Sequence, residues 1–129
     1  MIDWDAMSAR TERLMAEYDV RAEGAHVPIR TLSGGNQQKL VLARELELDS
    51  SSERALVVEN PTRGLDIRAT AAVRERLRSA AAAGAGVVVF SSDLDEVLAL
   101  AERVVVLHGG SATECARNRE AVGQAMLGM

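Results

Sequence analysis

A short motif of serine and glycine lies where a helix is predicted to begin. The stretch RTLSGGNQQKL, residues 30–40, places Ser33, Gly34 and Gly35 directly before residues that favour a helix. Each glycine costs a helix roughly 1 kcal/mol relative to alanine, so two in succession require a reason. Backbone N–H groups at a helix N-terminus, together with the Ser33 hydroxyl, offer several donors to a phosphate. The motif therefore indicates an anion site, and a serine N-cap on a flexible loop is the alternative.

Two further polar clusters follow predicted strands. ENPTRGLD, residues 59–66, comes directly after the apolar run 55–58, and SSDLDE, residues 91–96, follows the next apolar run. Ligands gather at the carboxyl ends of strands in open α/β sheets, where an acid such as Glu59 can hold Mg²⁺ through water. The alternative for Glu59 is an acid that caps a turn before Pro61. Three polar motifs in this order are hard to obtain by chance.

The elements expected to position these motifs alternate between helix and strand, which predicts an α/β fold. The strands, at 55–58, 86–90 and 104–107, are β-branched and continuous, as expected of parallel strands covered on both faces. Ser92 or Asp93 is expected to cap one helix at its start, and Gly84 to cap another at its end. The stretch DSSSE interrupts the pattern after the second helix. Helices are predicted up to about Glu17 and over residues 36–48, 67–83, 94–102 and 114–127.

Composition limits the class of protein. The 129 residues fit one domain, and a net charge of −4 gives no electrostatic reason to expect nucleic acid as a partner. The single cysteine, Cys115, cannot form an internal disulfide and lacks neighbours at metal-ligand spacing. His26 and His108 have no partner motif and are interpreted as ordinary loop or strand-end histidines. The apolar runs are shorter than the roughly 20 residues of a membrane span, so a soluble chain that could dock on a membrane protein is expected.

These motifs together resemble the nucleotide-binding subunits of ABC transporters over nearly the whole chain. LSGGNQQKL looks like the family signature, ALVVENPTRGLD like the Walker B strand with the D-loop, and VVVFSSDLDEVLALAERVVVL like the switch strand, its helix and the final core strand. Asn36 in the signature, NPTRGLD and SSDLDE look most like the second, degenerate half of the tandem ATPases that drive import of simple sugars or nucleosides.

The resemblance implies a role for each motif. Ser33, Gly34, Gly35 and Asn36 would bind the γ-phosphate of an ATP held mainly by the opposite nucleotide-binding domain, and so would act in trans. Glu59 would be the Walker B acid and would support Mg²⁺. The D-loop would comprise Gly64, Leu65 and Asp66, with Asp66 touching the partner domain.

Two departures from the family pattern predict weak catalysis. Asn60 stands where the family has its catalytic glutamate, and a neutral amide cannot take a proton from water, a loss of about 10²–10⁴-fold. Ser92 stands at the position of the switch histidine. Neither catalytic position is intact, so an ATP site built on these residues is expected to be slow or inactive.

A larger departure is that no Gly-x-x-x-x-Gly-Lys-Ser/Thr motif occurs in the sequence, so the Walker A loop is missing. The resemblance then implies part of a P-loop NTPase (RecA-like) core, with parallel strands and flanking helices but without the Walker A strand. Residues 1–48 would end the helical subdomain, and residues 53–129 would form the C-terminal part of the core. In related ATPases the Walker A strand lies between the switch strand and the final strand, so a gap or exposed sheet edges are expected.

Three functions are compatible with these motifs. The first is an ATP-binding component, or a fragment of one, of an ABC importer for simple sugars or nucleosides, which uses ATP and Mg²⁺ in a composite site. Its partners would be a second nucleotide-binding domain and the membrane permease, on the cytoplasmic face of the plasma membrane. The second is a non-catalytic regulatory module that docks on a complete nucleotide-binding domain. The third is a truncated product without an independent role.

Overall fold

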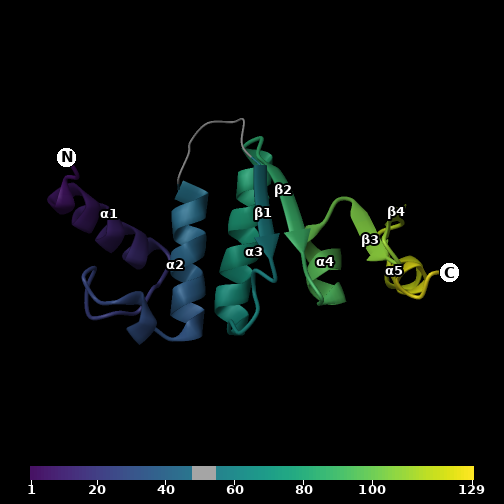
Figure 1. Ribbon diagram of the computed structural model, residues 1–129, viewed down its shortest axis with the longest axis horizontal. Coiled ribbons are helices and arrows are strands. Elements are labelled where there is room, and N and C mark those ends of the chain that lie inside the picture. The colour runs from purple at the N-terminus through teal and green to yellow at the C-terminus, as the bar shows by residue number, and fades with distance from the viewer. Residues whose placement is uncertain (48–54) are drawn as a thin grey trace.

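A computed structural model describes residues 1–47 and 55–129, and strands and helices alternate over residues 55–108 (Figure 1). The helices are α1 (Trp4–Glu17), α2 (Gly34–Glu47), α3 (Ile67–Ala82), α4 (Leu94–Leu100) and α5 (Arg119–Met126), with one turn of 3₁₀ helix at Ile29–Thr31. The strands are β1 (Ala55–Glu59), β2 (Gly86–Phe90), β3 (Val104–His108) and β4 (Ser111–Cys115). The predicted α/β class is confirmed.

Strands β1 and β2 form a parallel pair joined through α3. Their register runs from Ala55 opposite Gly86 to Glu59 opposite Phe90. Helix α3 ends where Gly84 takes a φ of +98°, a conformation that glycine adopts without strain. Because both strands point the same way, the polar clusters that follow them lie at the same edge of the sheet (Figure 1).

Only one face of the β1–β2 sheet is covered, which corrects the expectation of two covered faces. On the covered face, Val58, Val87 and Val89 pack on a cluster formed by Leu42 of α2 with Val73 and Leu77 of α3. On the opposite face, here called the open face, the exposed fractions are 76% for Val57, 58% for Val88 and 51% for Phe90. The strands are apolar on both sides, but helices of the described residues pack on one side alone.

The third predicted strand does not join the β1–β2 sheet. Strand β3 pairs antiparallel with β4, and the two form a sheet separate from β1–β2. The turn between them consists of Gly109 and Gly110, with φ values of +54° and +79°, and a two-residue hairpin turn favours such positive values. Strands β2 and β3 therefore lie in different sheets, and the expected parallel pairing of the third strand was wrong.

The last helix was also predicted too long, because residues 111–115 extend the hairpin as β4 and α5 begins only at Arg119. A second apolar cluster lies here, with Val104 and Val106 of β3 packed against Val122 of α5. The other helices lie close to their predicted ranges, although α2 begins at Gly34 rather than Asn36. The DSSSE stretch, the predicted helix end at Leu48 and the subdomain boundary near residues 48–53 fall largely outside the described residues. Within the two described ranges, no helix is long and apolar enough to cross a membrane.

The open face predicts that the isolated chain associates with itself. The apolar side chains of Val57, Val88 and Phe90 are exposed, and within residues 1–47 and 55–129 no strand pairs with either edge of the two-stranded β1–β2 sheet. We expect Val88→Lys to raise the dissociation constant for association at least about tenfold, since it places a charge where apolar surface would be buried. Analytical ultracentrifugation over a range of concentrations measures this.

The matched control is Val105→Lys on β3, where the wild-type side chain is 53% exposed. This change should leave association through the open face unaltered. A wild-type chain that is a monomer at every concentration, with a sharp unfolding transition independent of concentration, would contradict the prediction.

Candidate functional site

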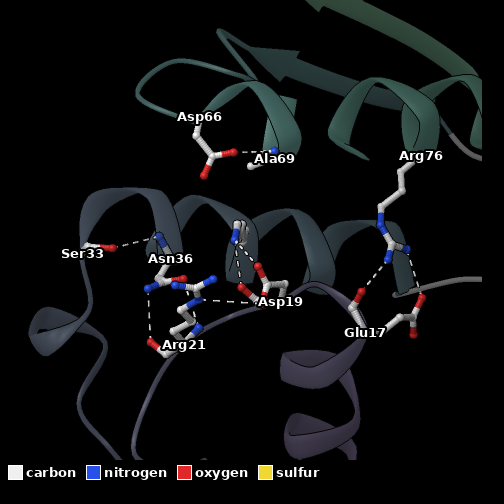
Figure 2. Close-up of polar contacts among 9 residues, drawn as sticks. Glu17, Asp19, Arg21, Ser33, Asn36, Asp66, Ala69 and Arg76 are labelled. Carbon is white, nitrogen blue, oxygen red and sulfur yellow. Dashed lines mark hydrogen bonds and ion pairs between the residues drawn. The ribbon is translucent and has the colours of Figure 1, made fainter. Parts of the chain in front are cut away.

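The serine of the first motif caps helix α2, and both glycines lie in the first turn of that helix. The Ser33 Oγ accepts a hydrogen bond from the Asn36 backbone N–H at 3.4 Å (Figure 2), and the Ser33 carbonyl accepts one from Gln37 at 2.9 Å. The serine N-cap that was the alternative to an anion site is therefore present. A cap of this kind still leaves N–H groups of the first turn directed out of the helix end, so the two roles are compatible.

Nothing in the described part of the chain requires glycine at these two positions. Neither Gly34 nor Gly35 has a positive φ. A Cβ added at Gly34 would have no neighbour within 4 Å, and one added at Gly35 would lie 3.5 Å from the Leu65 side chain, an ordinary contact distance. The missing side chains therefore leave exposed space at the end of α2, and the fold of the chain does not use that space.

Asn36 is engaged within the chain. Its side-chain Oδ1 accepts from the Arg21 N–H at 3.0 Å, and its Nδ2 donates to the Arg21 carbonyl at 3.2 Å (Figure 2). This pair of hydrogen bonds holds the loop after α1 against the first turn of α2. The expectation that Asn36 contacts a nucleotide stays a prediction, but the described contacts give this side chain a role in positioning the loop.

The loop 60–66, which follows β1, is held against α2 by Gln38. The Gln38 Nε2 donates to the carbonyl of Asn60 at 3.1 Å and to the carbonyl of Pro61. Asn60 has a φ of +45°, which few residues other than glycine adopt. The Leu65 side chain of this loop also lies beside Gly35 of α2, 3.5 Å from where a Cβ would be. The signature motif and the loop 60–66 are therefore neighbours in one chain, a contact that the sequence did not reveal.

An open groove of about 1370 Å³ lies beside these groups. Its walls are the N-terminal part of α2, strand β1 and the loop 60–66, and Ser33, Gly34, Gly35, Asn60 and Asp66 all line it. The groove therefore collects most of the residues that the sequence singled out.

Asn60 and Ser92, which stand at the two positions where the sequence departs from the catalytic residues of the family, are hydrogen-bonded to each other. The Asn60 Oδ1 accepts hydrogen bonds from the backbone N–H of Ser92 at 3.2 Å and from its hydroxyl at 3.4 Å. A backbone N–H can only donate, so the amide oxygen of Asn60 must face Ser92. No general base lies at this contact, because a neutral amide and a hydroxyl do not accept a proton from water near neutral pH.

The candidate magnesium ligand is one carboxylate at the end of β1. Glu59 is exposed, and the described residues contain no group of three or more His, Cys, Asp or Glu side chains that could hold a metal. Mg²⁺ is commonly held by one or two carboxylates, with waters and substrate phosphates as its other ligands. A single exposed acid at the strand end fits that donor set when a nucleotide supplies the phosphates.

The D-loop residues lie in the turn before α3. Gly64 has a φ of +76°, and the Asp66 carboxylate accepts from the Ala69 N–H at 2.8 Å, so Asp66 is the N-cap of α3 (Figure 2). The Asp66 side chain is exposed, and contact with a partner domain stays a prediction. Outside the site, Cys115 packs against the second apolar cluster, and His108 is the last residue of β3, which agrees with its interpretation as a strand-end histidine.

Sequence reasoning missed a buried carboxylate beside the site. Glu96 of α4 is 2% exposed, and its two oxygens accept hydrogen bonds from the hydroxyls of Thr62 and Ser91, each at 2.5 Å. The pattern Asp93-x-x-Glu96 resembles a capping box, which would place Glu96 at the surface, bonded back to the Asp93 N–H. The Asp93 N–H instead donates to the Ser91 hydroxyl at 3.1 Å, which leaves the Glu96 carboxylate for the loop contacts.

The sequence of this chain is similar to those of known import ATP-binding proteins. No protein-family model matches the chain. The chain is 40% identical over 109 residues to the nucleoside import ATP-binding protein of Lactococcus lactis subsp. cremoris, covering 84% of this chain and 21% of that protein. It is 38% identical to the ribose import ATP-binding protein of Streptomyces avermitilis, covering 98% of this chain and 25% of the relative. It is also 38% identical to the glucose import ATP-binding protein of Haloferax volcanii, covering 98% of this chain and 24% of that protein. The chain thus spans about a quarter or less of these relatives.

The ion pair that anchors the loop after α1 predicts a measurable titration. The Lys39 Nζ donates to the Asp19 carboxylate at 3.2 Å, and this hydrogen bond and the charge of Lys39 lower the pKa of Asp19. The pair therefore stabilises the fold above the ordinary pKa of an aspartate, and this contribution is lost as pH falls through the lowered pKa. Lys39→Gln should raise the pKa of Asp19 toward its ordinary value, as NMR titration of the carboxyl carbon would detect.

The control for this titration is Arg44→Gln, which removes a cation of the same helix that pairs with Glu45 instead. It should leave the Asp19 pKa where it is. Equal Asp19 pKa values in the wild-type chain and in Lys39→Gln would contradict the described pair.

Proposed function

Because this chain is homologous over most of its length to the ATP-binding proteins of ABC-type ribose, nucleoside and glucose importers, we propose that it supplies the signature half of a composite ATP site in such an importer. In this proposal Ser33, Gly34 and Gly35 bind the γ-phosphate of an ATP that a second nucleotide-binding domain holds. The chain then acts in trans, as a component or part of a larger ATPase.

The observation that carries the proposal is the pair of glycines that the fold does not need. Helical glycine costs up to about 1 kcal/mol relative to alanine, and a Cβ at Gly34 or Gly35 would fit within this chain. Space kept free at a helix N-terminus, next to N–H donors, suits the close approach of a phosphate from outside. A ligand or a partner surface gives these glycines the reason that the chain itself does not.

The position of the D-loop supports the same interpretation. Gly64 and Leu65 lie beside Gly35, so a partner that reaches the signature motif would also meet the D-loop. The sequence has no Gly-x-x-x-x-Gly-Lys-Ser/Thr motif, so the partner would provide the loop that cradles the phosphates. When bound, Mg²⁺ would neutralise phosphate charge, and Glu59 is the residue of this chain that would hold it.

The Asn60–Ser92 contact favours nucleotide binding without rapid hydrolysis in the site to which these two residues belong. The amide oxygen of Asn60 is occupied by the two donors of Ser92, and an amide cannot accept the proton of an attacking water. This observation also favours the second candidate, a non-catalytic module that regulates a complete nucleotide-binding domain by binding to it. In both cases this chain contributes structure and phosphate contacts, and a partner contributes the chemistry.

The partners in this proposal are a second nucleotide-binding domain and, through the assembled complex, permease subunits at the inner face of the plasma membrane. The relatives import ribose, nucleosides or glucose, so the solute is proposed to be a simple sugar or a nucleoside.

Substitution of Gly34 separates folding from function. Gly34→Ala should leave the chain as stable as the wild type or up to about 1 kcal/mol more stable, because alanine favours the helix. Gly34→Asp should also fold, since its Cβ meets no atom within 4 Å, yet its carboxylate would repel a phosphate. We expect Gly34→Asp to weaken ATP binding by the complex of this chain with a complete nucleotide-binding domain at least about a hundredfold. The carboxylate would repel the phosphate and keep it from the hydrogen-bond donors of the first turn of α2.

Urea unfolding measures the stability of each variant, and fluorescence titration with a labelled ATP measures its binding. Gly123→Asp is the control, because Gly123 also has no atom within 4 Å of an added Cβ but lies in α5, away from the groove. Equal ATP affinity for complexes with Gly34→Asp and Gly123→Asp would be evidence against the phosphate role of Gly34.

The chain alone is expected neither to hydrolyse ATP nor to bind it tightly, because only half of the site is present. Addition of a complete nucleotide-binding domain with its own Walker A loop should be required for binding, and Ser33→Ala should then weaken it about tenfold through loss of one hydrogen bond to a charged group. Phosphate-release and equilibrium dialysis assays test this. Micromolar ATP affinity with turnover by the purified chain alone would overturn the proposal.

A further inference from the structure

Glu96 is the one charged residue that is buried among the described residues. Its carboxylate joins three segments: Glu96 itself lies in the first turn of α4, Thr62 lies in the loop after β1, and Ser91 lies directly after β2. A carboxylate inside a protein is costly unless hydrogen bonds satisfy both oxygens. Here each oxygen accepts one hydroxyl at 2.5 Å, which is a short distance typical of a hydroxyl bound to a charged acceptor.

The two hydroxyl donors are close neighbours of Asn60 and Ser92. Thr62 comes two residues after Asn60, and Ser91 comes directly before Ser92. Glu96 therefore holds the backbone on both sides of the Asn60–Ser92 contact. Together with the hydrogen bond that the Asn60 N–H donates to the Phe90 carbonyl at 2.7 Å, Glu96 ties the segment after β1 to the segment after β2.

Gln38 holds the same loop from the opposite side. It donates to the carbonyls of Asn60 and Pro61 from α2, while Glu96 accepts from Thr62 on the side of α4. Within the loop, the Arg63 N–H donates to the Asn60 carbonyl and the Leu65 N–H donates to the Thr62 carbonyl, both at 3.1 Å. The loop is thus a short, internally bonded turn whose first three residues are held from two sides, and its Leu65 side chain lies beside Gly35.

We propose that Glu96 is a positioning residue of the candidate nucleotide site: its carboxylate fixes the loop 60–66 and thereby sets the places of Asn60 and Leu65 at the groove, and of Ser92 beside Asn60. The assignment of that site to a nucleotide rests on the function proposed above, whereas the positioning itself is a property of this chain. Glu96 does not touch the ligand and acts through Thr62 and Ser91.

A residue that only stabilises the fold would behave differently from a positioning residue. Loss of a residue that only stabilises the fold would raise amide hydrogen exchange by a similar factor throughout the structure. Loss of Glu96 as a positioning group should raise exchange chiefly at the Arg63, Leu65 and Ser92 amides, whose partners belong to the loop, while amides in the middle of α3 change less.

The experiment measures amide exchange by NMR on the full chain without nucleotide. We expect Glu96→Ala to accelerate exchange at Arg63, Leu65 and Ser92 about tenfold or more relative to the α3 amides, since two hydrogen bonds to a charged group are lost. Glu96→Gln should recover most of the protection, because its oxygen can accept from Ser91 while its NH₂ donates to the Thr62 hydroxyl. Thr62→Val removes one hydroxyl without removing the carboxylate and tests the proposal if Glu96→Ala does not fold.

Two control variants accompany these. Glu102→Gln changes an exposed acid just after α4, and Thr113→Val changes an exposed threonine on β4. Neither should alter loop exchange. Unchanged loop exchange in both Glu96→Ala and Thr62→Val, or acceleration equal to that of the α3 amides, would overturn the proposal, as would Glu96→Gln behaving like Glu96→Ala.

A second measurement separates this inference from the proposed function. If the wild-type chain binds ATP together with a complete partner domain, Glu96→Ala should weaken binding about tenfold and Glu96→Gln less, and unchanged affinity would overturn the role at the nucleotide site. If the wild-type pair binds no ATP, the proposed function fails, and the exchange measurement alone decides whether Glu96 positions the loop.

Discussion

The candidate site depends on one constraint: the loop 60–66 is held between two helices by polar side chains. Gln38 of α2 donates to two loop carbonyls, and Glu96 of α4 accepts from Thr62, so the loop cannot move without breaking contacts on one side or the other. Parallel pairing of β1 and β2 brings the two strand ends to one edge and makes these contacts possible. The Asn60–Ser92 pair, the D-loop turn and the space beside Gly35 all take their places from this arrangement.

A second physical feature is that one face of the β1–β2 sheet carries exposed apolar side chains that no described residue covers. Parallel strands are usually buried on both faces, and these strands carry apolar side chains on both. Relatives with import ATP-binding names are four or more times as long as the aligned region. The open face and the glycine-lined groove therefore share one property: each is a surface whose residue types suit contact with further polypeptide or ligand.

The sequence predicted the positions of helices and strands better than it predicted which strands pair and which side chains are in contact. The α3 crossover and both strands of the parallel pair followed from apolar runs with a glycine stop, because local patterns determine them. The hairpin of β3 and β4 was missed, although Gly109-Gly110 is a strong turn signal, since the residues after it are polar and resemble a helix start. The positions of Ser33, Asn60 and Ser92 were predicted from their motifs, but the role of Glu96 depends on contacts across 34 residues of sequence, which no local pattern reveals.

The central claim is that the first turn of α2 faces the terminal phosphate of an ATP held by another domain. An ATP analogue with a photoreactive group on its γ-phosphate tests this directly, with mass spectrometry to map the attachment. The account predicts labelling of residues 33–36 only when a complete nucleotide-binding domain is present, and none on the chain alone. Labelling elsewhere on the chain, or none at all while the partner domain binds the analogue, would contradict it.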